Sequence, residues 1–140
     1  MKIIIGGSMT FAREQLEAKE TLEKNGHSVL LTDNIEDYAN HPNIKKSFKE
    51  ELQLCLKDDI MRSFFNKIAE SDAFLVCNYL NKKIEGYIGT SVLMELGLAY
   101  HLKKKIYLLY DIDQSQKYAL EIAIINPIIL NGDLSKVDSI

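Results

Sequence analysis

Short apolar runs alternate with amphipathic stretches along the whole chain. The run KIIIGG at residues 2–7 ends in glycines, which predicts a buried strand that runs into a turn. Residues 10–27 place apolar side chains at helical spacing and close on Asn-Gly, a common helix stop. The run SVLLTD at residues 28–33 predicts a second strand. These three elements together predict a right-handed crossover between parallel strands.

The middle of the chain holds a polar stretch, a long helical pattern and an apolar run. Residues 34–43, NIEDYANHPN, are polar and contain a proline, which predicts a loop that is mobile or lid-like. From Ile44 to Ser71 apolar residues recur at helical spacing, and the pattern fits either one long helix or two. The continuous apolar run DAFLVCNY at residues 72–79 predicts a central strand buried on both faces.

The last part of the chain repeats the alternation. Residues 86–100, GYIGTSVLMELGLAY, predict a glycine-containing turn and then an apolar helix that begins near Thr90 or Ser91. The run LKKKIYLLYD predicts a strand, SQKYALEIA a short helix, and PIILNGD a final strand with a turn.

This order of elements predicts one domain over residues 1–140. Its fold class is α/β, a three-layer, doubly wound parallel sheet of about five strands in the flavodoxin-like order 2-1-3-4-5. In such sheets ligands bind beyond the carboxyl ends of the strands, near the switch in strand order. Polar and glycine residues gather at four predicted strand ends: Gly6-Gly7-Ser8, Asn78-Tyr79, Tyr110-Asp111 and Asn131-Gly132.

Composition narrows the class of protein. A chain that is 46% hydrophobic and 26% charged is typical of a soluble globular domain with one core. The net charge of -3 argues against a nucleic-acid partner, although helix amino termini can hold a small anion without net positive charge. The amino terminus is too short and too soon broken by glycine for a signal peptide or membrane span, so we expect a cytoplasmic protein without a membrane partner.

Cysteine and histidine usage points to no metal or cofactor chemistry. Cys55 and Cys77 lie in apolar surroundings without CxxC spacing, which favours two buried reduced thiols. The three histidines are scattered, so we expect no metal site and no cofactor.

Glu95 is the most unusual side chain for its surroundings. Ser91 and Glu95 are four residues apart, so both lie on one face of the predicted helix, near its amino terminus. The helix dipole favours the ionised carboxylate, whereas the apolar neighbours disfavour it by desolvation. Such a carboxylate suits a nucleophile or general base; the alternative is an exposed glutamate on an amphipathic helix.

The glycines after the first strand also fit two interpretations. Gly6 and Gly7 would allow close approach of the backbone to a phosphate or a sugar hydroxyl, next to free N–H groups at the helix start. Alternatively they form only a tight turn, with Ser8 or Thr10 as N-cap.

The segment SDAFLVCNY…YIGTSVLMELGLAYHLKKKIYLL resembles the nucleoside 2-deoxyribosyltransferase superfamily, which includes the deoxynucleoside 5'-monophosphate N-glycosidases. It is most similar to uncharacterised bacterial and archaeal members, which share the YIG loop and the late PIILNGDL. The residues that carry the resemblance are Asp72, Gly86, Gly89, Met94-Glu95-Leu96-Gly97 and, near the amino terminus, Gly7, Ser8 and Met9.

The resemblance implies a function. It implies that Glu95 is the nucleophile that attacks C1' of a 2-deoxyribose, so that the base is released or exchanged. It implies a small-molecule nucleoside or nucleotide as partner and a homodimer or higher homo-oligomer, in which Asn131 reaches a neighbouring subunit's site. The substrate-binding residues that it implies are Gly7, Ser8, Met9, Asn78, Gly89, Thr90 and Ser91.

Two departures from the family pattern leave a second function open. Phe64 stands where the relatives carry an aspartate, and any of Asp58, Asp59, Arg62 or Asn66 could substitute for it. Thr10 stands where the monophosphate N-glycosidases carry a basic residue. The sequence therefore predicts either an N-glycosidase or deoxyribosyltransferase, or a non-catalytic nucleotide-binding or sensing module on the same fold.

Overall fold

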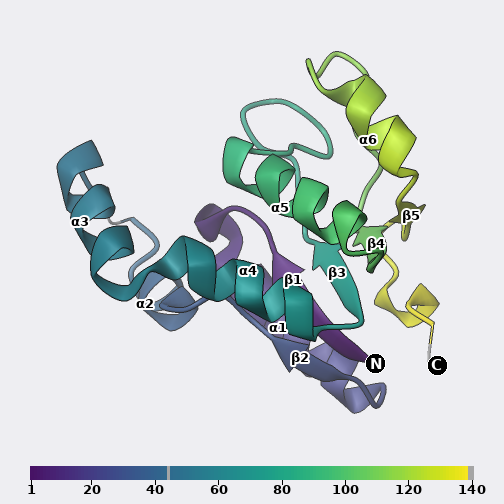
Figure 1. Cartoon of the computed structure of the whole chain (residues 1–140), viewed down its shortest axis with the longest axis horizontal. Coiled ribbons are helices and arrows are strands. Elements are labelled where there is room, and N and C mark those ends of the chain that lie inside the picture. Colours follow the sequence, from purple (N-terminus) through teal and green to yellow (C-terminus); the bar gives the residue numbers. More distant parts are fainter. Residues whose placement is uncertain (44, 139–140) are drawn as a thin grey trace.

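A computed structural model describes residues 1–43 and 45–138. Its centre is a five-stranded parallel sheet in the order β2-β1-β3-β4-β5, which confirms the predicted α/β class and strand order (Figure 1). Residues Ile3 to Gly6 pair with Ala73 to Val76, so the first strand and the central strand end at the same edge. The strands are β1 (Lys2–Gly6), β2 (Ser28–Leu30), β3 (Ala73–Val76), β4 (Lys105–Leu108) and β5 (Ile128–Ile129).

Helices cover both faces of the sheet and make the three predicted layers. After a short 3-10 turn, η1 (Met9–Phe11), helix α1 (Ala12–Lys24) packs on one face together with η2 (Leu134–Lys136). Helices α4 (Ile60–Glu70), α5 (Thr90–His101) and α6 (Ala119–Ile125) pack on the other face. All four residues of β3 are buried, as expected for a central strand with a helix layer on each side.

The polar stretch at residues 34–43 is not the loop that its composition predicts. It contains helix α2 (Ile35–Asn40), which begins after Asn34 in the left-handed conformation, with φ 67°. Ile35 and Ala39 are four residues apart and pack together against Ala12 at the start of α1. This one buried pair is enough to hold a short helix in an otherwise polar segment.

The long helical pattern resolves into two helices. Helix α3 (Phe48–Asp58) is followed by Asp59, whose φ of 44° is left-handed, and α4 begins at the next residue. Ile44, where the predicted helical segment begins, lies outside the described residues. Helix α3 buries none of its residues and projects from the body of the molecule (Figure 1). Its apolar Phe48 and Leu56 are therefore exposed.

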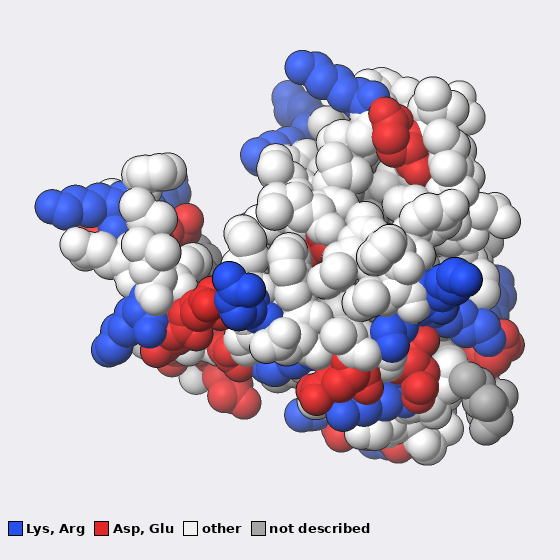
Figure 2. All heavy atoms as spheres, viewed as in Figure 1, with Lys and Arg blue, Asp and Glu red and all other residues white. Residues whose placement is uncertain are grey.

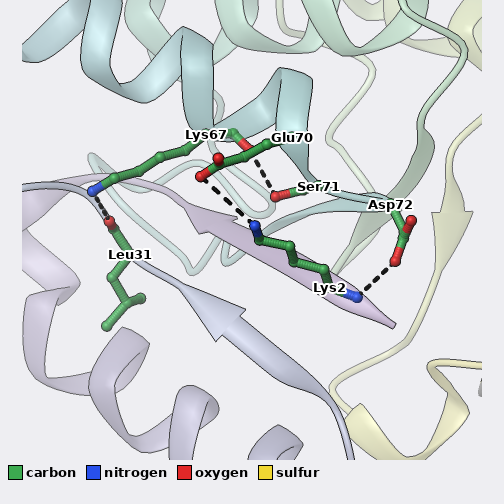
Figure 3. A network of polar contacts seen from close by, with 6 residues as sticks. All are labelled: Lys2, Leu31, Lys67, Glu70, Ser71 and Asp72. Carbon is green, nitrogen blue, oxygen red and sulfur yellow. Dashed lines mark hydrogen bonds and ion pairs between the residues drawn. The ribbon is translucent and has the colours of Figure 1, made fainter.

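Polar contacts tie α4 to the strands at the amino edge of the sheet (Figure 3). The Asp72 carboxylate accepts a hydrogen bond of 2.8 Å from the backbone N–H of Lys2, and the Ser71 hydroxyl donates one of 2.6 Å to the Lys67 carbonyl. The Lys2 ammonium lies 3.8 Å from the Glu70 carboxylate. Asp72, which belongs to the family resemblance, therefore joins β1 to β3 at the edge opposite the strand ends that hold the candidate site. Within the described ranges no helix has the length and apolarity needed to cross a membrane.

Candidate active site

A cavity of about 300 Å³ lies at the carboxyl edge of the sheet. The end of β1, the segment after β2, and helices α2 to α5 all contribute to its wall. Figure 2 shows α3 standing apart from the body of the molecule, with a hollow between them. The lining residues are Gly6, Gly7, Met9, Thr32, Asp33, Tyr38, Glu51, Cys55, Ile60, Met61, Phe64, Phe65, Ser91, Met94 and Glu95.

Glu95 faces this cavity from the second turn of α5. The helix begins at Thr90 with Gly89 as N-cap, so Ser91 and Glu95 share the face predicted from their spacing, and both line the cavity. The adjacent face of α5 is buried against the sheet through Val92, Leu96 and Ala99, so Glu95 lies at the border of the buried face.

The half-buried carboxyl group of Glu95 lies in apolar surroundings. Desolvation raises its pKa from 4.5 to about 8, and no hydrogen bond or neighbouring charge in the described part of the chain opposes that shift. At neutral pH only about a tenth of such a group is ionised. Glu95 is therefore a carboxyl group whose ionisation would gain from a cationic partner.

The turn after β1 supplies backbone to the cavity wall. Gly7 has a φ of 150°, and a Cβ there would lie 3.0 Å from the Cys77 carbonyl and 3.2 Å from the Gln15 amide nitrogen. Only glycine fits this position, and Gly7 and Met9 both line the cavity. Ser8 instead caps η1, because its hydroxyl accepts a hydrogen bond of 3.2 Å from the Thr10 N–H. Ser8 thus acts as the N-cap of the turn, as one interpretation of the sequence expected. Gly7 fits the other interpretation, in which a glycine lets the backbone approach a ligand closely.

Asp33 is a second carboxylate in the cavity wall that sequence reasoning missed. Its two oxygens accept hydrogen bonds from the Ser63 hydroxyl, at 2.6 Å, and from the Lys67 ammonium, at 2.7 Å. The Lys67 hydrogen bond and then that of Ser63 lower the pKa of Asp33, so it is ionised at neutral pH. Asp33 ends the run SVLLTD, so the rule that ligands bind at strand ends could have found it.

Aromatic side chains form another part of the wall. Phe64, which stands at the family's aspartate position, is buried and meets Phe74 edge-on at 5.9 Å between ring centroids. Phe65 and Tyr38 also line the cavity. The four polar residues that could substitute for the missing aspartate, Asp58, Asp59, Arg62 and Asn66, do not line it. Asp59 and Arg62 instead form an exposed ion pair of 3.0 Å.

Helix α3 brings Glu51 and Cys55 to the cavity. Cys55 is exposed, so the expectation of a buried thiol is wrong at this position, because α3 does not pack against the core. Cys77 is buried, as expected, and burial raises the pKa of its thiol to about 12. Among the described residues, no group of three metal-ligating side chains is arranged to hold a metal ion.

Five of the site residues implied by the family resemblance lie outside the cavity wall: Ser8, which caps η1, and Asn78, Gly89, Thr90 and Asn131. Asn78 is buried, and its side-chain amide donates to the Tyr110 carbonyl at 2.6 Å and accepts from the Tyr110 N–H at 3.0 Å. Gly89 is half-buried at the N-cap of α5, and Thr90 is exposed. Asn131 is exposed in a left-handed turn after β5, at the opposite edge of the sheet from β2. Their substrate-binding roles remain predictions.

Comparison with known proteins finds similarity to solved structures. No protein-family model matches the chain, and no curated protein is significantly similar to it in sequence. The structure of the CMP N-glycosidase BcmB of Clostridium botulinum is similar, with a TM-score of 0.51 and 19% sequence identity over 99% of this chain and 98% of that chain. At this identity the similarity shows a shared fold alone, and at that level it agrees with the family resemblance of the sequence.

Proposed function

We propose that this chain, which shares its fold with a CMP N-glycosidase, cleaves or transfers the N-glycosidic bond of a nucleoside or nucleotide with Glu95 as nucleophile. The observation that carries the proposal is the half-buried Glu95 carboxyl group, which faces a cavity at the carboxyl edge of a doubly wound sheet. The chain's own family resemblance at Met94-Glu95-Leu96-Gly97 supports the same role.

The reaction follows from the chemistry of a carboxylate next to an anomeric carbon. An ionised Glu95 oxygen attacks C1' of the sugar, and the electron pair of the C1'–N bond leaves with the base, which takes up a proton from water. The resulting glycosyl ester is opened when water, or the nitrogen of a second base, attacks C1'. The carboxylate is then restored, and the two-step route replaces one difficult displacement by two easier ones.

Partial burial of Glu95 affects this reaction in two ways. It keeps most of the carboxyl groups protonated at neutral pH, because the pKa is about 8. It also strengthens the attraction between the ionised carboxylate and the positive charge that develops at C1' in the transition state. The ionised fraction should therefore limit the rate below pH 8, whereas each ionised Glu95 is more effective than an exposed one.

A second candidate function is binding without turnover. Phe64 lines the cavity in place of the family's aspartate, and a protonated Glu95 can donate a hydrogen bond to a sugar hydroxyl instead of attacking carbon. A nucleotide-binding or sensing module on this fold would use the same cavity. We further propose a homodimer or higher homo-oligomer, which the exposed apolar side chains of α3 support, and a cytoplasmic location.

Base release separates the two functions. Ribonucleosides, 2'-deoxynucleosides and their 5'-monophosphates are incubated with the purified chain, and free base is measured by chromatography. We expect base release by the wild type and its loss in Glu95→Ala, whereas Glu121→Ala, at an exposed position on α6, serves as the matched control. Base release that persists in Glu95→Ala contradicts the nucleophile. Thermal stabilisation by a ligand that is never cleaved indicates the binding module instead.

A further inference from the structure

We propose that Asp33 determines the base specificity of this site by accepting hydrogen bonds from a base that carries an exocyclic amino group. This inference rests on the proposed function, because it places a nucleoside in the Glu95 cavity. It concerns the wall formed by the segment after β2, which holds none of the residues that carry the family resemblance.

Asp33 is held in a fixed position. The Ser63 hydroxyl and the Lys67 ammonium, both from α4, hold one oxygen each, and Lys67 is itself fixed by a hydrogen bond of 2.8 Å to the Leu31 carbonyl (Figure 3). Each carboxylate oxygen accepts up to about two hydrogen bonds, so both retain a free acceptor site. Asp33 therefore presents to the cavity a positioned group that accepts and does not donate.

The distance across the sheet suits a base between the two carboxyl groups. Asp33 follows β2, whereas Glu95 lies on α5, which packs against β3 and β4. Strand β1 separates β2 from β3, so the backbones of β2 and β3 lie roughly two strand spacings, or ~10 Å, apart, and Asp33 and Glu95 both line the cavity at this edge of the sheet. A sugar whose C1' contacts Glu95 can thus direct its base toward Asp33.

The wall around Asp33 favours a base over a sugar at that end of the cavity. Tyr38 and Phe65 line the cavity, are half-buried, and offer flat apolar surface against which a planar ring can pack. An amino group at the far edge of that ring would donate to Asp33. A keto oxygen in the same place would meet the carboxylate as a second acceptor, which leaves both groups unpaired in a partly dehydrated site.

The test measures affinity for four nucleosides that differ at this group. Cytidine and adenosine carry the amino group, and uridine and inosine carry a keto oxygen. Titrations of the full chain are followed by calorimetry, with Glu95→Gln as the background wherever a ligand is consumed. We expect amino-bearing nucleosides to bind about tenfold or more tightly than their keto counterparts. In Asp33→Asn this ratio should fall to about one or reverse, because an amide also donates.

Asp58→Asn is the matched control, since Asp58 is exposed and outside the cavity wall. It should keep the wild-type ratio. Equal binding of the amino and keto nucleosides by the wild type, a preference that survives Asp33→Asn, or no binding of any of the four would each overturn the inference. Base release without an amino preference overturns this inference alone. An amino preference without base release leaves it standing and overturns only the catalytic function.

Discussion

Replacing Glu95 by glutamine should stabilise the protein, and by an amount that grows with pH. The carboxyl group has a pKa of about 8 in the folded chain, against 4.5 for an unperturbed glutamate. A glutamate whose folded pKa is raised contributes its full stability below the unfolded pKa, and that stability is lost as pH rises toward the folded pKa. Glutamine has a similar shape and does not titrate, so it does not lose stability in this way.

The size of the effect follows from the two pKa values. Relative to low pH, where Glu95 is protonated in both the folded and the unfolded chain, linkage lowers the unfolding free energy of the wild type by about 0.8 kcal/mol at pH 5 and by about 3.3 kcal/mol at pH 7. The difference in unfolding free energy between Glu95→Gln and the wild type should therefore grow by about 2.5 kcal/mol between these two pH values. Because the comparison is made between two pH values, any constant effect of the substitution on packing cancels.

Urea denaturation at both pH values measures this difference, provided that unfolding is two-state. Glu121→Gln on α6 is the control and should track the wild type at both pH values, because Glu121 is exposed. If the difference in unfolding free energy between Glu95→Gln and the wild type is the same at pH 5 and pH 7 within about 0.5 kcal/mol, Glu95 ionises as freely as a surface glutamate. That result would refute the partly buried carboxyl group on which the proposed site depends.

Two further predictions concern the loop before α5 and the charge of the ligand. Gly86→Ala should destabilise the chain by about 2 kcal/mol or more, because Gly86 has a φ of 62° and a Cβ would collide with the Asp111 carbonyl. Gly97→Ala is its control and should stabilise α5 by about 0.5–1 kcal/mol, since nothing lies near the new Cβ. Thermal melts in which Gly86→Ala is as stable as Gly97→Ala, or more stable, would contradict this geometry. Unphosphorylated nucleosides should bind more tightly than their 5'-monophosphates, because the described residues that line the cavity include three carboxyl groups and no Lys, Arg or His. Tighter binding of the monophosphates in the same titrations would show that a basic residue outside the wall reaches the ligand.

Local patterns were sufficient to predict the sheet and the position of Glu95. Continuous apolar runs marked the buried strands, and the spacing of Ser91 and Glu95 placed both on one face of α5, which in the structure lines the cavity. Asp33 could also have been predicted, because it ends the second apolar run, but the strand ends considered did not include it. A rule about strand ends finds candidate residues only when it is applied to every strand.

The contribution of α3 could not be read from local pattern. Its apolar spacing is that of a core helix, yet a left-handed Asp59 turns the chain so that α3 projects and Glu51 reaches the cavity. The left-handed conformation is unfavourable for most residues, and nothing in the sequence around Asp59 demands it. Helix α2 was missed for a related reason, because its single buried pair, Ile35 and Ala39, is outweighed by polar neighbours.

The pH dependence of base release tests the central claim most directly. The rate kcat/KM of the wild type is measured between about pH 6 and pH 9 for a nucleoside that it cleaves, beside Glu95→Gln. If ionised Glu95 is the nucleophile, the rate should rise about tenfold per pH unit below a pKa of about 8 and then level off, and Glu95→Gln should release no base. A wild-type rate that is flat or falls over this range, or a Glu95→Gln variant that still releases base, would contradict the account.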